Sequence, residues 1–211
     1  MKTKSTLLLC LILMIAVISK AQINKGASAL GGNIHFATGS SKGDNGFKEN
    51  STDVLISPSF MMFHSQNHAI GINLNFGYLK NSYFGQKVNS YGAGVFLRQY
   101  KNLGKNFYVF AQEALNFDYS KNLYKVDSSN FIQVDNRTYQ ASFTVNPGIS
   151  YDLSKKFQLE LIFLNDLLSI EYLYTDARAT SIKNHNFSIG SNLDISEIST
   201  LNIGAKIFFG R

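Results

Sequence analysis

Apolar and polar residues alternate along this chain in a series of strand-length segments, and this periodicity limits the folds open to it. The clearest case lies between residues 200 and 211, where every second position is apolar, from Leu201 through Ile203 to Phe209. A period of two places successive side chains on opposite faces of a β-strand. We therefore predict an all-β fold with strands over 28–37, 52–63, 69–78, 91–100, 107–117, 139–151, 157–167 and 199–209.

The last predicted strand also carries a spaced set of residue types. Asn202, Gly204, Ile207 and Phe209 form the series polar, glycine, apolar and aromatic. The series resembles the C-terminal assembly signal by which outer-membrane β-barrels are recognised. That resemblance implies the barrel-assembly machinery as a partner.

The first 21 residues have the features of a secretory signal peptide. Lys2 and Lys4 precede an apolar run over 7–18, and the small residues Ser19 and Ala21 stand at the expected cleavage positions. The run is shorter than the ~20 residues of a membrane helix. We expect a signal peptide over 1–21 and one outer-membrane β-barrel domain over 22–211.

Composition excludes several kinds of chemistry. Cys10 is the only cysteine and lies inside the apolar run, so we expect neither disulfides nor thiol catalysis in the processed chain. The formal net charge is +6, and three of the lysines belong to the predicted signal peptide. The remaining excess of positive charge is too small to indicate a nucleic-acid-binding surface, and we expect no nucleic-acid partner.

Two predicted hairpins allow the strand register to be tested, because cross-strand neighbours share a face. Folding the chain about residue 66 places Met62 opposite Ile70 and Phe60 opposite Ile72. Folding it about Ser154 places Tyr151 opposite Phe157 and Ile149 opposite Leu159. Both registers pair apolar with apolar positions, and both hairpins are therefore predicted to be antiparallel.

Short and long connections alternate between the predicted strands. The short ones are 64–68, 101–106 and 152–156, and the longest connection covers 168–198. This alternation is typical of outer-membrane barrels. We predict an eight-stranded antiparallel up-and-down transmembrane β-barrel. Residues 186–195 alternate again, and three alternatives remain for them: a hairpin above the membrane, an extended part of the eighth strand, or a total of ten strands.

Alternation alone does not tell which face of the strands is outside. A soluble barrel points its apolar face inward, whereas a membrane barrel points it toward lipid. Here the apolar face is almost unbroken and the polar face carries few charges, which favours a membrane barrel. Aromatic residues near strand ends are expected to form the interfacial girdles: Phe63, Tyr78, Tyr100, Phe107, Tyr151 and Phe157. The alternative is a soluble periplasmic lipocalin-like barrel that binds an apolar ligand.

Most of the strand segments resemble the outer-membrane β-barrel domain common among Bacteroidetes secreted proteins, a relative in architecture of OmpA-like and OmpX-like barrels. The resemblance implies a location in the cell outer membrane and no catalytic residues. It rests on ISPSFMMF (56–63), AIGINLNFGY (69–78), GVFLRQY (94–100), NPGISYDLSKKFQLEL (146–161) and LNIGAKIFF (201–209).

Few charged residues are predicted to point inward: Asp53, Arg98, Glu113, Glu160, Asp166 and Lys206. An eight-stranded barrel is just wide enough for side chains to fill it, so charges inside it pair with one another. We predict an interior polar network of Arg98, Glu113, Glu160 and Lys206. The alternative, a path for protons or solutes, needs a wider lumen.

Histidines provide the remaining candidate chemistry. His64 and His68 share a short turn without a third ligand, so we predict no metal site, and no motif implies a cofactor. Barrel enzymes that deacylate lipid A carry His and Ser two residues apart on one strand face. His185 and Ser188 are three apart and should face opposite ways. A lipid-modifying acyl hydrolase or transferase at His185 remains an alternative, and it predicts loss of a lipid reaction in His185→Ala.

We expect a structural or surface-interaction protein that displays long extracellular loops, without enzyme activity. Its expected partners are outer-membrane lipid and the phosphates of lipopolysaccharide. The soluble alternative instead predicts release without detergent. The residues expected to meet lipopolysaccharide are Lys42, Lys48, Lys80, Lys87, Lys121, Lys125, Arg178 and Lys183.

Overall fold

A computed structural model describes residues 23–42, 48–82, 85–125, 133–162, 167–177, 182–191 and 202–211. The predicted signal peptide lies outside these residues. The strands are β1 (Ser28–Lys42), β2 (Lys48–Ser65), β3 (His68–Asn81), β4 (Gln86–Gly104), β5 (Phe107–Lys125), β6 (Gln133–Asp152), β7 (Phe157–Ile162), β8 (Leu168–Ala177), β9 (Ile182–Gly190) and β10 (Asn202–Phe209). No helix within the described ranges is long and apolar enough to cross a membrane.

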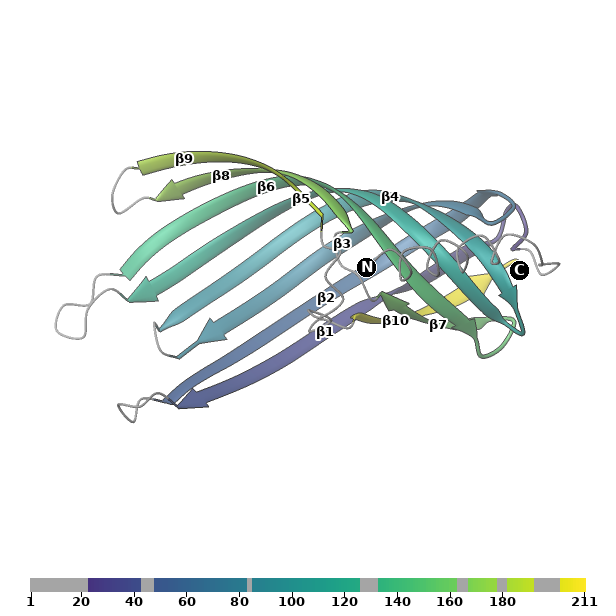
Figure 1. Ribbon diagram of the computed structural model, residues 1–211, viewed down its shortest axis with the longest axis horizontal. Helices are drawn as coiled ribbons and strands as arrows, with labels where there is room; N and C mark the ends of the chain where they lie inside the picture. Colours follow the sequence, from purple (N-terminus) through teal and green to yellow (C-terminus); the bar gives the residue numbers. More distant parts are fainter. Residues whose placement is uncertain are drawn as a thin grey trace, which may run out of the picture.

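Eight of these strands form a closed antiparallel barrel (Figure 1). Strands β1 to β7 follow one another around the ring, and β10 joins β7 to β1. The closing ladder places Ser28 opposite Phe209 and Ile34 opposite Ile203. Every neighbouring pair in the ring is antiparallel, which confirms the predicted eight-stranded barrel.

Strands β8 and β9 are additional to the ring. Residues 148–152 of β6 pair with β7, while its residues 136–145 pair with β8. Strand β8 thus continues the line of β7 along β6, and β9 pairs with β8. The expected long connection over 168–198 therefore contains two strands. This agrees with the ten-strand alternative raised by the alternation over 186–195, whereas β8 is not among the predicted strands. The period-two alternation of β8 and β9, as in Ser169, Ile170, Glu171 and Tyr172, is the physical reason they form a sheet.

The first predicted hairpin register is confirmed, and the second is wrong by two residues. Met62 lies opposite Ile70 as predicted. By contrast, Ile149 lies opposite Leu161 instead of Leu159. A shift of two residues leaves each side chain on the same face, so the apolar pattern does not distinguish the two registers. The turn determines which register forms. Its Leu153 N–H donates a hydrogen bond of 2.9 Å to the Phe157 carbonyl.

The outer surface of the barrel is apolar and its interior is buried. Large apolar side chains on the outside include Ile72, which is 56% exposed, whereas Phe96 inside is 3% exposed. The expected girdle residues divide between the two faces. Tyr78, Phe107 and Tyr151 are exposed on the outside, but Phe63 and Tyr100 are buried in the lumen. The girdle expectation is wrong for these two because their strand positions share the inward face with Met61 and Phe96.

Asn67 shapes the turn between β2 and β3. Its φ of 61° lies in the left-handed region, which asparagine tolerates better than most residues. The Ile23 N–H donates a 2.8 Å hydrogen bond to Asn67 Oδ1, and the Tyr100 N–H donates one of 2.8 Å to the Asn67 carbonyl. This turn therefore ties the segment before β1 to β4 at the same end of the barrel.

We expect Asn67→Ala to lower the free energy of unfolding by about 1–2 kcal/mol, because it loses the side-chain acceptor and strains the backbone. Urea unfolding in lipid vesicles measures the change. Asn67→Gly keeps the backbone conformation unstrained and should lose less. An unchanged stability in Asn67→Ala would contradict this role of the turn.

Candidate functional site

The lumen is closed by packed aromatic side chains near the end of the barrel that carries the short turns, which we call the turn end. Tyr100 packs against Phe63, Tyr108 and Phe110, with ring centroids 5.7, 6.2 and 5.6 Å apart. Phe208 of β10 lies 6.0 Å from Phe63 of β2, and β1 lies between these two strands. These rings come from four different strands and fill the interior from several sides.

Above the aromatic rings lies a buried ionic cluster of Arg98, Glu160 and Lys206. Arg98 Nη1 lies 2.6 Å from Glu160 Oε1, and Lys206 Nζ lies 3.4 Å from Glu160 Oε2. The three side chains are at most 2% exposed. Because they come from β4, β7 and β10, the ion pairs connect strands on different sides of the ring.

Neutral groups add hydrogen bonds to the cluster. The Tyr100 hydroxyl donates to Glu160 Oε1 at 3.1 Å, and Arg98 Nε donates to Gln112 Oε1 at 3.0 Å. The Arg98 guanidinium also lies 4.3 Å from the centroid of the Phe110 ring, where a cation is attracted to the ring face. A buried charge is stable only with such partners.

The structure brings together three of the four residues expected in the interior network, and the expectation for Glu113 is wrong. Glu113 lies opposite Leu97 on β4 and Val145 on β6, which belong to the outer apolar face. Residues 107–111 of β5 are apolar on both faces, so the sequence around Glu113 does not show which face points into the lumen. Of the other expected inward charges, Asp53 Oδ2 lies 3.9 Å from His35 Nε2, and Asp166 lies outside the described residues.

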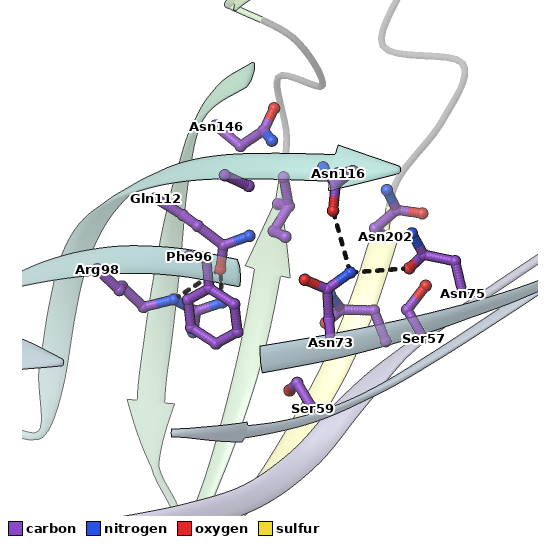
Figure 2. A pocket seen from close by; sticks show the side chains of 13 residues that line it. Ser57, Ser59, Asn73, Asn75, Phe96, Arg98, Gln112, Asn116, Asn146 and Asn202 are labelled. Atoms are coloured by element: carbon purple, nitrogen blue, oxygen red, sulfur yellow. Dashed lines mark hydrogen bonds between the residues drawn. The ribbon is translucent and has the colours of Figure 1, made fainter. Parts of the chain in front are cut away.

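An amide-rich cavity of about 150 Å³ lies beside the ionic cluster (Figure 2). Asn73 Nδ2 donates hydrogen bonds to Asn75 Oδ1 at 3.0 Å and to Asn116 Oδ1 at 3.2 Å. The side-chain oxygens of Asn33 and Asn73 have no hydrogen-bond partner in the described part of the chain. Most of the lining consists of neutral polar groups, with the paired charge of Arg98 and the apolar side chains of Phe96, Ala114 and Ile162 completing it. It suits water or a small neutral polar molecule.

Glycine at 94 makes room for these amides. A Cβ at this position would lie 2.1 Å from Asn116 Oδ1 and 2.8 Å from Asn73 Oδ1. Such distances are shorter than any real contact, so a side chain here would displace both amides. The lack of a side chain at this inward position of β4 therefore allows both amides to line the cavity.

Arg211 closes the turn end of the barrel. Its guanidinium donates to Asp152 Oδ1 at 2.8 Å and to the Tyr108 hydroxyl at 2.8 Å. Burial lowers the pKa of Arg211, but the hydrogen bonds to Asp152 outweigh it and leave the pKa above its ordinary value. Sequence reasoning missed this contact, because Asp152 and Arg211 are far apart in the chain and no periodicity connects them.

The histidines do not form a catalytic or metal-binding constellation in the described ranges. His185 of β9 lies opposite Tyr174, while Ser188 lies opposite Glu171 on the other face. The Tyr172 hydroxyl is 2.7 Å from His185 Nδ1. The rings of His64 and His68 are 6.3 Å apart, and no group of three metal-ligating side chains is found in these ranges.

The four residues of the expected assembly signal lie on both faces of β10. Asn202 lines the amide cavity, whereas Ile207 and Phe209 are exposed on the outer face. Gly204 faces the lumen, and a Cβ there would lie 2.1 Å from Asn33 Oδ1. The glycine thus has a packing reason independent of recognition by an assembly machine.

A closed antiparallel ring with an apolar exterior and ions and amides inside is a transmembrane β-barrel. The chain belongs to the outer membrane protein β-barrel domain family, whose sequence model matches residues 7–194. A search of curated proteins gives no match.

Solved structures of several outer-membrane barrels are similar. Neisserial surface protein A is 12% identical with a TM-score of 0.44, covering 90% of this chain and 100% of that one. A major outer membrane protein from Thermus thermophilus is 10% identical with a TM-score of 0.41, covering 86% and 99%. The translocator domain of the autotransporter NalP from Neisseria meningitidis is 8% identical with a TM-score of 0.42, covering 98% and 94%.

We expect Glu160→Ala to lower the free energy of unfolding by about 3–5 kcal/mol, because it leaves two buried cations without their shared carboxylate. Urea unfolding in vesicles measures the loss. Glu171→Ala is a matched control, since Glu171 is only partly buried and has no hydrogen-bond or ion-pair partner in the described ranges. A similar loss in both variants would show that the ionic cluster does not stabilise the barrel more than an unpaired carboxylate does.

Proposed function

We propose that this chain is an integral outer-membrane protein of structural and surface-interaction type, without intrinsic catalysis. The observation that carries the proposal is the inverted distribution of side chains, with an apolar exterior and a polar, ionic interior. Such a surface is stable in lipid and aggregates in water. We further assign it to the small barrels of Bacteroidetes type, with OmpA-like or OmpX-like architecture, exported by the signal peptide over residues 1–21.

The filled lumen supports a role other than transport. Arg98, Glu160 and Lys206 are almost completely buried, and the aromatic rings below them pack against one another. A soluble apolar-ligand carrier would need an apolar cavity inside, whereas the described cavity beside the cluster is lined mostly by amides and hydroxyls. The opposite directions of His185 and Ser188 likewise give no support to a lipid hydrolase.

The first test is membrane fractionation followed by gel electrophoresis with and without heating. We expect the chain to remain in the detergent-soluble envelope fraction and to change its apparent size on heating, because a closed barrel resists detergent until it is unfolded. Release into the aqueous fraction without a heat shift would refute the membrane assignment and favour the soluble barrel.

Two lysines support an interaction with anionic lipid at the end opposite the short turns. Lys80 and Lys87 are directly opposite each other on β3 and β4, and both are exposed. They follow the exposed apolar series of β3, which ends at Tyr78. Like charges directly opposite each other repel, and an anion between them relieves this repulsion. Phosphate groups of lipopolysaccharide are the anions available at such a surface.

The remaining expected lipopolysaccharide contacts have less support. Lys121 lies 3.3 Å from Asp135 Oδ2, so its charge is already paired. Lys183 is exposed on β9 but lies opposite an acidic residue, Asp176 of β8. Arg178 and the side chains of Lys42, Lys48 and Lys125 lie outside what the structure describes. We therefore assign the anionic contact to the pair formed by Lys80 and Lys87.

We expect the double variant Lys80→Gln/Lys87→Gln to bind lipopolysaccharide about tenfold more weakly, because two surface cations are removed. Co-purification with lipopolysaccharide from mixed micelles measures retention. Lys101→Gln/Lys105→Gln is the matched control, since these exposed lysines lie at the turn end. Equal retention by all three proteins would remove lipopolysaccharide from the proposal.

A further inference from the structure

Glu113 is a charged residue on the outer face of the barrel. Its cross-strand partners are Leu97 and Val145, and Leu115, on the same face of β5, is 42% exposed. Gln99 of β4, opposite Ala111, is a second polar side chain exposed on this face, and most of the large exposed side chains around the middle of the strands are apolar. Among them are Leu30, Ile34, Ile56, Phe60, Ile70, Ile72, Leu74, Phe76, Val95, Leu97, Leu115, Ile149, Leu159, Ile203 and Ile207.

The position of Glu113 along β5 places it at the centre of the lipid-facing band. Phe107 packs against Tyr151 with ring centroids 4.6 Å apart, and Tyr119 packs against Tyr139 at 5.2 Å. Such aromatic pairs mark the two membrane interfaces. Glu113 lies midway between Phe107 and Tyr119 in the strand. When tilted, the segment of β5 from Phe107 to Tyr119 spans roughly 30 Å, which is the thickness of the hydrocarbon layer.

The carboxyl group has no partner within the described chain. No described residue forms a hydrogen bond or an ion pair with Glu113. Acyl chains offer neither donors nor acceptors, so a carboxyl group at this depth is unfavourable in a barrel surrounded only by lipid. A partner that supplies hydrogen bonds removes this penalty.

The surface beside Glu113 is also hollowed. A depression of about 160 Å³ is lined mainly by apolar residues of β3, β4, β5 and β6. It includes Ile70, Val95, Leu97 and Phe143 together with Glu113 itself. An apolar hollow with one carboxyl group at its edge suits a protein surface that has the same two features.

We propose that this face, formed by β3 to β6 around Glu113, is the contact between two copies of the barrel in the membrane. A carboxyl group can donate one hydrogen bond and accept others when protonated, so two of them satisfy each other. A two-fold axis places the same residue of each copy at the same point, which makes Glu113 opposite Glu113 the natural centre. The proposal rests on contact between the outer face and lipid, as in the proposed function.

The test uses the processed chain, residues 22–211, which contains no cysteine and is reconstituted in lipid vesicles after its heat shift has been verified. Cysteine is placed at Ala111, which is exposed on β5 near Glu113, and a short bis-maleimide is added. We expect a cross-linked dimer that persists as the protein is diluted in lipid. The control is Leu30→Cys on β1, which lies on the opposite side of the ring. No dimer, or equal cross-linking at both positions, would overturn the proposal.

Substitutions at Glu113 distinguish hydrogen bonding from apolar contact. In the Ala111→Cys background we expect Glu113→Leu to weaken dimerisation about tenfold, since it removes the paired hydrogen bonds. Glu113→Gln should dimerise within a few-fold of the parent, because an amide also donates and accepts. Unchanged dimerisation in Glu113→Leu would reject Glu113 as the centre of the contact. Because each variant must first show the heat shift, failure of the dimer is distinct from failure of the membrane assignment.

Discussion

Pairing of backbone polar groups is the constraint on which the rest of the structure depends. In a membrane every strand edge must find a partner, and a ring is the arrangement that leaves none exposed. The ladder between β1 and β10 supplies this closure, with Gly31 and Gly32 of β1 lying close to the neighbouring backbones. Once the ring has closed, alternate side chains of every strand face lipid and the lumen. The outer face is therefore apolar, and the inner face can be polar.

Closure at eight strands then determines what the interior can contain. The lumen is narrow enough for side chains to meet across it, so charges that point inward must compensate one another. Arg98, Glu160 and Lys206 do so with a single carboxylate shared by two cations. Tyr100 and Gln112 add hydrogen bonds, and aromatic rings pack below the cluster. A plugged interior and an apolar exterior leave the outer surface and the ends for contacts with other molecules.

Alternation predicts the strands and most faces because both depend on local sequence. Alternation does not predict features that depend on turns or on closure of the ring. The β6–β7 register depends on the turn at Leu153 and Phe157, since a two-residue shift preserves faces. Strand β8 is missed, although Ile170 and Tyr172 alternate with polar neighbours, because the segment 157–167 is already long enough to cross a membrane. The contact between Arg211 and Asp152 joins residues distant in sequence, and only the closed ring brings them together.

Glu113 and Glu160 show why the face of a strand must be known before a charge is interpreted. Both carboxylates lie among apolar residues of their strands, and the sequence alone places them in one network. The turn after β4 has positive φ angles at Gly104, Lys105 and Asn106, and it sets Leu97 opposite Glu113. A register different by one residue would have turned Glu113 inward. The same residue type therefore holds two cations inside the barrel at one position and faces lipid at the other, where the missing partner must come from outside the chain.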